Sequence, residues 1–308
     1  MMAPMILTEE DVESRLEYAD LIPLMRATMA QFSRGEAIQP ERQMLPIEPE
    51  RRYLGVMPAA LPHAMGAKLV TFYPKNANTG VHTHNAMIAL LDVENGLPLA
   101  FVGGRLITEM RTAALSAAVS SVLAKPDSKV LGIVGSGVQA NAHLKALKHL
   151  FQFSEVRVWS PNKAHADAFA EQNDATSLPL QDTVIDADIV VVATNSKEPV
   201  LRGSWLKKGA HVNSVGSPRP NWRELDDDVM RNELVVDSRS AVLLEAGDVI
   251  LSNARISAEA GELFSGKLSI APSNTTLFKS VGLAVQDIAT ARFLYDKIVN
   301  SHVDARDT

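Results

Sequence analysis

The chain contains no cysteine among its 308 residues, and aromatic residues make up only 5% of it. Without cysteine, disulfide bonds, thiolate metal ligands and cysteine nucleophiles are excluded. No uninterrupted apolar run of about 18 residues is present, so we expect no membrane-spanning helix. The amino terminus also lacks the basic start and apolar run of a signal peptide. We therefore expect a cytoplasmic protein that does not bind a membrane.

An excess of positive charge is also missing. Thirty Lys and Arg residues stand against 36 Asp and Glu residues, giving a net charge of −6. This balance argues against nucleic-acid binding, which depends on many phosphate contacts, and a small molecule is the expected partner. Hydrophobic residues make up 46% and charged residues 21% of the chain, as in folded globular proteins. At about 150 residues per domain, we expect two domains.

The first third of the chain combines helix and strand patterns. Thr8 precedes three acidic residues and predicts a helix start. We expect this helix to reach about Gly35, with an interruption near Pro23. Residues 67–73 and 86–91 resemble antiparallel strands. Asn95-Gly96 predicts a hairpin from the second of these strands into residues 98–102.

From about Thr112 the pattern changes to a helix followed by alternating strands and helices. Such alternation is typical of an α/β fold with a parallel sheet. We also expect residues 278–301 to form a helix. The expected strands are residues 130–134, 156–159, 189–193, 211–215 and 234–236.

A glycine loop follows the first of these strands. The residues run Gly135-Ser136-Gly137-Val138-Gln139-Ala140 and lead into a helix. This is the G-x-G-x-x-A form of the dinucleotide loop. Gly135 permits the tight turn, Gly137 lets a pyrophosphate approach, and Ala140 lets helix and strand pack closely. Val138 and Gln139 open the helix whose amides would face the phosphates. An ordinary βα turn is the alternative interpretation.

The second strand ends at Trp159, where an NAD enzyme would carry an acidic residue for the ribose. Here Ser160, Asn162 and Lys163 follow the strand. Without a carboxylate to repel a 2′-phosphate, the sequence favours NADP, with NAD possible. Ser160 or Asn162 could instead only cap the next helix.

Seven short sequence motifs, in the same order along the chain, resemble those of the ornithine cyclodeaminase/mu-crystallin family. Within that family the sequence is most similar to the mu-crystallin-type ketimine reductases. The resemblance spans nearly the whole chain. The runs cover residues 52–58, 68–73, 111–114, 135–139, 209–213, 222–226 and 278–280.

This resemblance implies a homodimer with a Rossmann-type doubly wound sheet inserted in a smaller α+β substrate and dimerisation domain. The expected boundaries are 1–112 plus 273–308 for the substrate domain and 113–272 for the dinucleotide-binding domain. The nicotinamide is expected in the cleft between them.

The resemblance also assigns residues. Arg42, Lys68 and Arg111 match substrate-binding positions and are our candidate catalytic residues. Arginine suits a bidentate grip on a carboxylate, and a lysine ammonium can donate a proton. A solvated surface charge is the alternative for each.

Further family positions concern the cofactor and the pocket wall. Glu245 matches a substrate-pocket position, and Arg219 could add charge there, although either could be a surface residue. His82 and His84 share one strand face, but no third ligand is evident, so we expect no metal. The remaining cofactor-binding candidates are His84, Arg111, Thr112, Ala193, Thr194, Val215, Gly216 and Ser280.

One departure from the family pattern concerns the reaction. Cyclodeaminases and alanine dehydrogenases of the family carry an aspartate where this chain has Pro218. Proline has no group to take a proton, so ornithine cyclodeamination is doubtful. We therefore expect NAD(P)H-dependent reduction of cyclic ketimine carboxylates to cyclic amino acids.

Two alternatives remain open. One is an alanine-type amino-acid dehydrogenase or an ornithine cyclodeaminase. The other is a binding protein of the mu-crystallin kind without relevant turnover. The three basic candidates argue against a bare binding protein.

Overall fold

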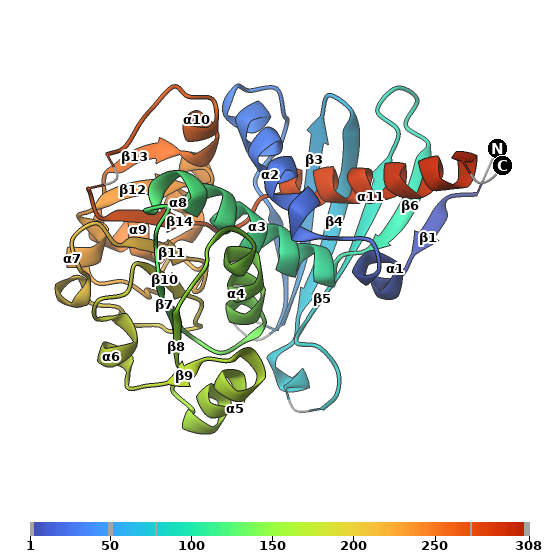
Figure 1. Ribbon diagram of the computed structural model, residues 1–308. Helices are drawn as coiled ribbons and strands as arrows, with labels where there is room; N and C mark the ends of the chain where they lie inside the picture. The colour runs from blue at the N-terminus through green and yellow to red at the C-terminus, as the bar shows by residue number, and fades with distance from the viewer. Residues whose placement is uncertain (1–2, 49–51, 78, 272, 305–308) are drawn as a thin grey trace. The chain divides into compact units, whose positions relative to one another are not determined.

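The computed structural model describes residues 3–48, 52–77, 79–271 and 273–304. Contacts divide these residues into two units (Figure 1). The first unit lies within Met1–Arg111 and Leu283–Thr308, and the second is Thr112–Gly282. The first boundary falls inside one long helix. The second lies ten residues later than the expected end at 272.

The first unit is a six-stranded sheet with helices. The strand order is β1-β6-β5-β4-β3-β2, antiparallel except for the β1/β6 pair. The strands are β1 (Met5–Leu7), β2 (Gln43–Glu48), β3 (Arg52–Leu61), β4 (Ala64–Phe72), β5 (His84–Leu91) and β6 (Pro98–Gly103). The helices are α1 (Glu9–Glu13), α2 (Tyr18–Ser33), the start of α3 (Arg105–Leu123), α11 (Ala284–Asp304) and the 3₁₀ helix η1 (Pro74–Asn76).

Helix α11 packs on β3, β4 and β5 and also contacts α2 (Figure 1). Side chains alternate across a strand, so Lys68, Ile88 and Val102, which are register partners in neighbouring strands, share one face. All three are buried. Leu69, which follows Lys68, and Met87, which precedes Ile88, point to the other face and are exposed.

The amino-terminal helix prediction is partly wrong. Thr8 caps α1 through the backbone N–H of Asp11, as expected. The break, however, falls between Ser14 and the extended residue Glu17. Pro23 lies inside α2. Proline at this sixth position of α2 has no N–H to bond the carbonyl four residues earlier, yet the helix continues through it. The Asn95-Gly96 turn does join β5 to β6.

The second unit is an eight-stranded parallel sheet in the order β13-β12-β14-β11-β10-β7-β8-β9. The strands are β7 (Val130–Val134), β8 (Glu155–Trp159), β9 (Thr176–Ser177), β10 (Ile189–Val192), β11 (His211–Ser214), β12 (Glu233–Val236), β13 (Ile256–Glu259) and β14 (Thr276–Lys279). The helices are α4 (Val138–Leu150), α5 (Lys163–Asn173), α6 (Leu180–Val184), α7 (Asp227–Met230), α8 (Arg239–Glu245), α9 (Gly247–Ser252), α10 (Ala260–Phe264) and η2 (Gly203–Trp205), together with the end of α3.

The strand order reverses between β7 and β10, because β8 and β9 follow on one side and β11 on the other. In open α/β sheets, ligands bind beyond the carboxyl ends of strands at such a switch point. The α/β fold with a Rossmann-type parallel sheet is confirmed.

Two expectations for the carboxyl-terminal part are wrong. The segment from Phe278 does not begin a helix, because β14 pairs with β11 and β12 in the parallel sheet. The chain therefore leaves the second unit after Gly282 and not at 272. Helix α11 begins at Ala284.

By length and hydropathy alone, α3 could cross a membrane. However, 67% of it is buried inside the protein, and core helices have the same composition.

Candidate functional site

Two charged side chains, Lys68 and Arg111, meet at the buried carboxylate of Asp287 in the first unit. Lys68 Nζ, from β4, lies 2.6 Å from Asp287 Oδ2. Arg111 Nε, from α3, donates to Asp287 Oδ1 at 2.9 Å. Arg111 Nη1 also donates to Gln286 Oε1. Lys68 is 2% exposed and Asp287 is fully buried, so water screens these charges poorly.

The pKa of Lys68 responds to this environment. Burial lowers it, Asp287 raises it, and the charges of Arg111 and Arg42 lower it again, giving a pKa of about 8. Arg42 is half-buried just before β2. It is close enough for its charge to lower the pKa of Lys68. The predicted cations Arg42, Lys68 and Arg111 therefore gather in one place.

His84 lies on the same sheet face as Lys68, opposite Phe72 in the register. The His84 and Phe72 rings are 4.5 Å apart, and Tyr53 stacks on Phe72 at 5.8 Å. Desolvation and the charge of Lys68 lower the pKa of His84. No group of three potential metal ligands occurs among the residues that the structure describes.

The glycine loop of the second unit connects β7 to α4. Gly135 has φ +115, and a Cβ there would lie 2.4 Å from the Ala193 carbonyl oxygen. Both features require glycine. A Cβ at Gly137, by contrast, would meet no atom within 4 Å.

Helix α4 has no side-chain cap and no acid in its first turn. Its first amides are therefore available to an anion. The Val138 side chain is 54% exposed, and the buried Gln139 Oε1 has no hydrogen-bond partner among the described residues. The uncapped amides at the start of α4 fit the pyrophosphate of a dinucleotide.

At the end of β8, Asn162 caps α5 by accepting from the Ala164 N–H at 3.0 Å. Ser160 is half-buried. Lys163 is 82% exposed and pairs with Asp167 at 2.6 Å on the same helix. The acid that would repel a 2′-phosphate is absent, but Lys163 already has a partner.

The next candidates follow β10 and β11, at the same carboxyl edge of the sheet. Ala193 and Thr194 follow β10, and Val215 and Gly216 follow β11. Glu224 Oε1 accepts from Thr194 N at 2.6 Å and from Thr194 Oγ1 at 2.7 Å. A Cβ at Gly216 would lie 2.1 Å from the Thr194 carbonyl oxygen, which explains the glycine.

A buried ionic network supports these strand ends. Lys279 Nζ, from β14, lies 2.7 Å from Asp248 Oδ2 and 3.6 Å from Glu224 Oε2. It also donates to the Gly216 carbonyl at 2.8 Å. Burial opposes the charge of Lys279, but Asp248 and Glu224 raise its pKa overall. Burial raises the pKa of Glu224.

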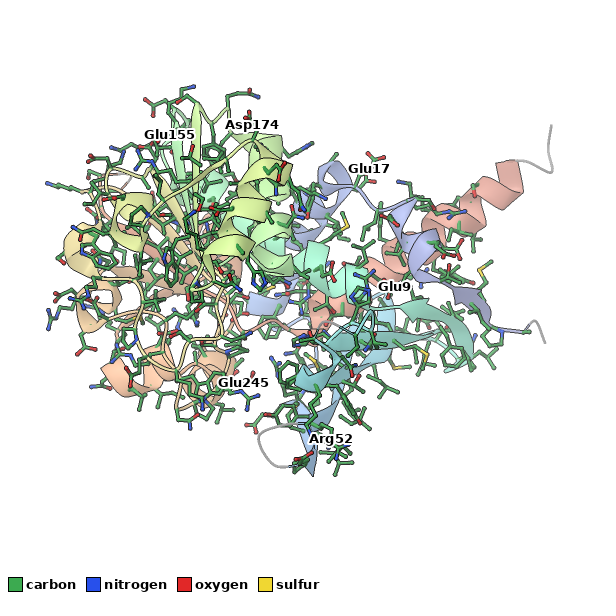
Figure 2. All side chains as sticks on the ribbon, turned by 90° about the horizontal axis from the view of Figure 1, so that it is seen from below. Glu9, Glu17, Arg52, Glu155, Asp174 and Glu245 are labelled. Carbon is green, nitrogen blue, oxygen red and sulfur yellow. The ribbon has the colours of Figure 1, made fainter. Side chains whose placement is uncertain are left out.

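The remaining candidates come from four further positions in the chain. Ser280 is buried after β14 and donates to Asp237 Oδ2 at 2.7 Å. Arg219 packs on the Trp222 ring at 4.6 Å, next to the exposed Pro218. Glu245 ends α8 and is half-buried (Figure 2). Thr112 is half-buried in α3.

The sequence interpretation missed Gln286, Asp287, Glu224, Asp248 and Lys279 as interacting groups. Lys279 and Glu224 lie in the family-like runs 278–280 and 222–226, but the sequence assigns them no function. A usable signal was present for Gln286 and Asp287, because these polar residues interrupt the apolar run Val281–Ala289. A charge inside a buried apolar segment needs a partner.

The parallel sheet and the glycine loop at its switch point define a dinucleotide-binding oxidoreductase class of fold. The chain belongs to the ornithine cyclodeaminase/mu-crystallin family, whose sequence profile matches residues 2–302. It is 45% identical over 304 residues to the ketimine reductase mu-crystallin of Mus musculus, covering 96% of this chain and 97% of that protein.

Two solved structures are similar over nearly the whole chain. The Δ1-pyrroline-2-carboxylate reductase of Thermococcus litoralis, in complex with NADH and L-proline, has a TM-score of 0.91 at 32% identity, covering 97% of this chain and 98% of that one. An archaeal alanine dehydrogenase dimer with bound NAD has a TM-score of 0.92 at 28% identity, covering 98% of both chains.

Proposed function

We propose that this protein is an NAD(P)H-dependent reductase that converts cyclic ketimine carboxylates of the pyrroline- and piperideine-2-carboxylate type to cyclic L-amino acids. The observation that carries the proposal is the buried cluster of Lys68, Arg111 and Asp287, with Arg42 nearby. Two buried cations share one acid, so the cluster has a net positive charge that favours a carboxylate substrate. Relatives named as ketimine and pyrroline-2-carboxylate reductases support the same reaction.

Each basic residue has a separate role in this proposal. Arg42 and Arg111 orient the substrate carboxylate, and Lys68 donates a proton to the imine nitrogen. When bound, a reduced nicotinamide would supply the hydride that turns the C=N bond into CH–NH, and it would leave oxidised. Lys68 would be left neutral until it takes a proton from water. A pKa of about 8 keeps most of Lys68 protonated at pH 7.

The carboxyl edge of the parallel sheet carries most of the cofactor-binding candidates of the second unit. We propose that Gly135, Gly137, Val138 and Gln139 contact the pyrophosphate, with Ser160, Asn162 and Lys163 at the adenosine ribose. Ala193, Thr194, Val215 and Gly216 then lie along the dinucleotide, while His84, Arg111, Thr112 and Ser280 serve its nicotinamide half. Arg219 and Glu245 remain candidates for the substrate pocket.

We favour NADP over NAD because β8 ends without the acid that NAD enzymes use for the ribose hydroxyls. The Lys163–Asp167 pair weakens this preference. Dissociation constants for NADPH and NADH, measured by fluorescence titration, test it directly. A clear preference for NADH would contradict the proposal.

An alanine-type dehydrogenase is the second candidate, favoured by the similarity to the archaeal alanine dehydrogenase. A spectrophotometric panel distinguishes the two. Purified protein is mixed with NADPH or NADH and with Δ1-pyrroline-2-carboxylate, Δ1-piperideine-2-carboxylate, pyruvate plus ammonia, or, with NAD, ornithine. We expect rapid cofactor oxidation with the cyclic imines. Oxidation with pyruvate and ammonia alone would support the dehydrogenase.

We further propose a cytoplasmic homodimer formed through the first unit. The exposed face of its sheet, opposite Lys68, carries Ile6, Leu45, Leu69, Met87 and Phe101. Each of these side chains is at least 36% exposed. Large exposed apolar patches are typical of protein interfaces.

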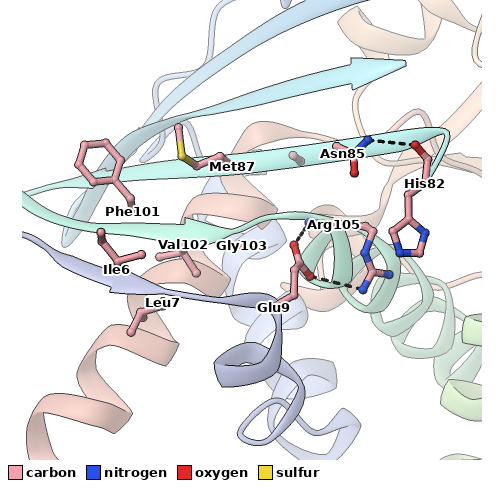
Figure 3. Close-up of a pocket in the computed structure, with 11 residues that line it drawn as sticks. Ile6, Leu7, Glu9, His82, Asn85, Met87, Phe101, Val102, Gly103 and Arg105 are labelled. Carbon is pink, nitrogen blue, oxygen red and sulfur yellow. Dashed lines mark hydrogen bonds and ion pairs between the residues drawn. The ribbon is translucent and has the colours of Figure 1, made fainter. Parts of the chain in front are cut away.

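A hollow of about 480 Å³ lies at one end of this face, along β1, β5 and β6 (Figure 3). Its apolar wall includes Ile6, Met87 and Phe101. Its polar end is already satisfied, because Glu9 accepts from the backbone N–H groups of Arg105 and Leu106 at the start of α3. The hollow is therefore suited to apolar side chains of a second copy.

A further inference from the structure

We propose that Asp287 is a positioning residue of the reductase site: it holds Lys68 as an aimed ammonium donor and fixes the guanidinium of Arg111 beside it. The chemistry of this inference rests on the proposed function. Its geometry rests on the contacts of one buried carboxylate.

The two oxygens of Asp287 serve different cations. Oδ2 lies 2.6 Å from Lys68 Nζ, and Oδ1 accepts from Arg111 Nε at 2.9 Å. The carboxylate therefore joins three elements, namely β4, α3 and α11. Asp287 also lies in the first turn of α11, where the helix dipole stabilises a negative charge.

Two contacts hold the ammonium group of Lys68. Nζ lies 2.6 Å from Asp287 Oδ2. It also donates to Thr108 Oγ1 at 3.3 Å, and Thr108 Oγ1 itself donates to the Gly104 carbonyl. These contacts position the ammonium group that would donate a proton to an imine nitrogen.

The charges of this cluster do not cancel, because Lys68 and Arg111 share one acid. A buried structural pair is neutral, because an uncompensated buried charge is strongly destabilising. Here Asp287 is the only acid within 4 Å of Lys68 and Arg111 among the described residues. Without Asp287, Lys68 would be buried next to Arg111 and close to Arg42, and it would lose its proton more easily.

The charged and titratable groups that face Lys68 come from four places. They are Asp287 on α11, Arg111 on α3, His84 on β5 and Arg42 before β2. Asp287 is the one group in this set that raises the pKa of Lys68. Its removal is therefore expected to move the titration of Lys68 to lower pH.

The test compares Asp287→Asn, Asp287→Glu and a control, Asp296→Asn, whose aspartate pairs with Arg292 on the surface of the same helix. The pH profile of kcat/KM is measured with Δ1-pyrroline-2-carboxylate and NADPH. For Asp287→Asn we expect the alkaline limb to move down by at least one pH unit, with a loss of tenfold or more at pH 8.5 and partial recovery at pH 6. Asp287→Glu should keep the limb near its wild-type position but lower kcat. The control should match the wild type.

An alkaline limb that stays in place in Asp287→Asn, or a kcat unchanged in Asp287→Glu, would overturn the proposal. The glutamate variant alone decides the question if the asparagine variant does not fold. A second readout needs no turnover: the Lys68 Nζ titration, followed by NMR of protein carrying ¹⁵N-labelled lysine, must shift down in Asp287→Asn. If the wild type does not reduce the imine, the proposed function fails, and this titration still tests Asp287.

Discussion

At the scale of single residues, Lys68 is the group on which the proposed reaction depends most. We expect Lys68→Met to lower kcat/KM for imine reduction by about 100-fold or more, the range for loss of a general acid. The variant should still fold, because Asp287 keeps Arg111 as a partner. NADPH affinity should stay the same, since the glycine loop belongs to the second unit.

Steady-state kinetics and fluorescence titration provide the measurements for Lys68→Met. Lys75→Met, at an exposed lysine of the same unit, is the matched control. A rate within twofold of the wild type would remove Lys68 from the mechanism.

Two buried histidines in the second unit make stability depend on pH. Burial lowers the pKa of His143 and of His211 to about 4. His143 Nδ1 donates to the Gln139 carbonyl at 2.7 Å, and Nε2 accepts from Ser116 Oγ at 2.9 Å. Both rings are therefore neutral in the folded protein at pH 5, whereas in the unfolded chain, with a pKa near 6.5, they are mostly protonated.

The unfolded state thus binds more protons than the folded state between about pH 6.5 and pH 4, so stability falls as the pH drops through this window. Each histidine accounts for up to about 3 kcal/mol of this loss. Urea unfolding at pH 7.5 and at pH 5 measures the loss, which should be smaller in His143→Gln than in the wild type. The exposed His149→Gln is the control, and an equal loss in both variants would show that His143 is not responsible.

The glycines could be predicted from their spacing, and the basic residues from the family resemblance, which places them at substrate-binding positions. Asp287 could not be assigned in the same way. An acid at a helix start is common for electrostatic reasons alone, and its two partners come from β4 and α3, far away in the chain. Only the folded structure brings these three groups together.

At the scale of elements, β10, β11 and β14 end around one ionic network. Lys279 pairs with both Asp248 and Glu224 and donates to the Gly216 carbonyl. The following residue, Ser217, has φ 47 and donates to the Ser196 carbonyl at 2.5 Å. These contacts join the loops after β10 and β11 to each other and to β14.

We expect Lys279→Met to lower the free energy of unfolding by about 3 to 5 kcal/mol, because it leaves two buried acids without their cation. NADPH affinity should also fall, since the strand-end loops lose a fixed contact. Urea unfolding and fluorescence titration measure the two effects. Lys208→Met, at an exposed position, should change neither. Unaltered stability in Lys279→Met would contradict the role given to the network.

The same strands show where element prediction succeeds. β7 lies at 130–134 as expected, because a short apolar run followed by a glycine loop is distinctive. The sequence instead predicts a helix from residue 278, because the strand Thr276–Lys279 is too short to show a period and helical residues follow it. Its place depends on pairing with β11 and β12, which no local pattern reveals.

At the scale of the whole molecule, the sheet of the first unit has two unlike faces. One packs on α11 and carries Lys68. The other face exposes two pairs of apolar residues that are neighbours on adjacent strands. These pairs are Ile6 with Phe101 and Leu69 with Met87. Apolar rows on an exposed sheet face favour association. The archaeal alanine dehydrogenase of similar structure is described as a dimer.

A charged residue introduced on this exposed sheet face should therefore dissociate the proposed dimer into monomers. We expect the wild type to sediment as a dimer at micromolar concentration and Leu69→Glu to sediment as a monomer, because a buried unpaired carboxylate in the interface costs several kcal/mol. Leu243→Glu, at a leucine of the second unit that is 56% exposed, is the matched control and should remain dimeric. Analytical ultracentrifugation gives the masses, and circular dichroism checks that the variant is folded. A monomeric wild type, or a Leu69→Glu variant that stays dimeric, would exclude this face as the interface.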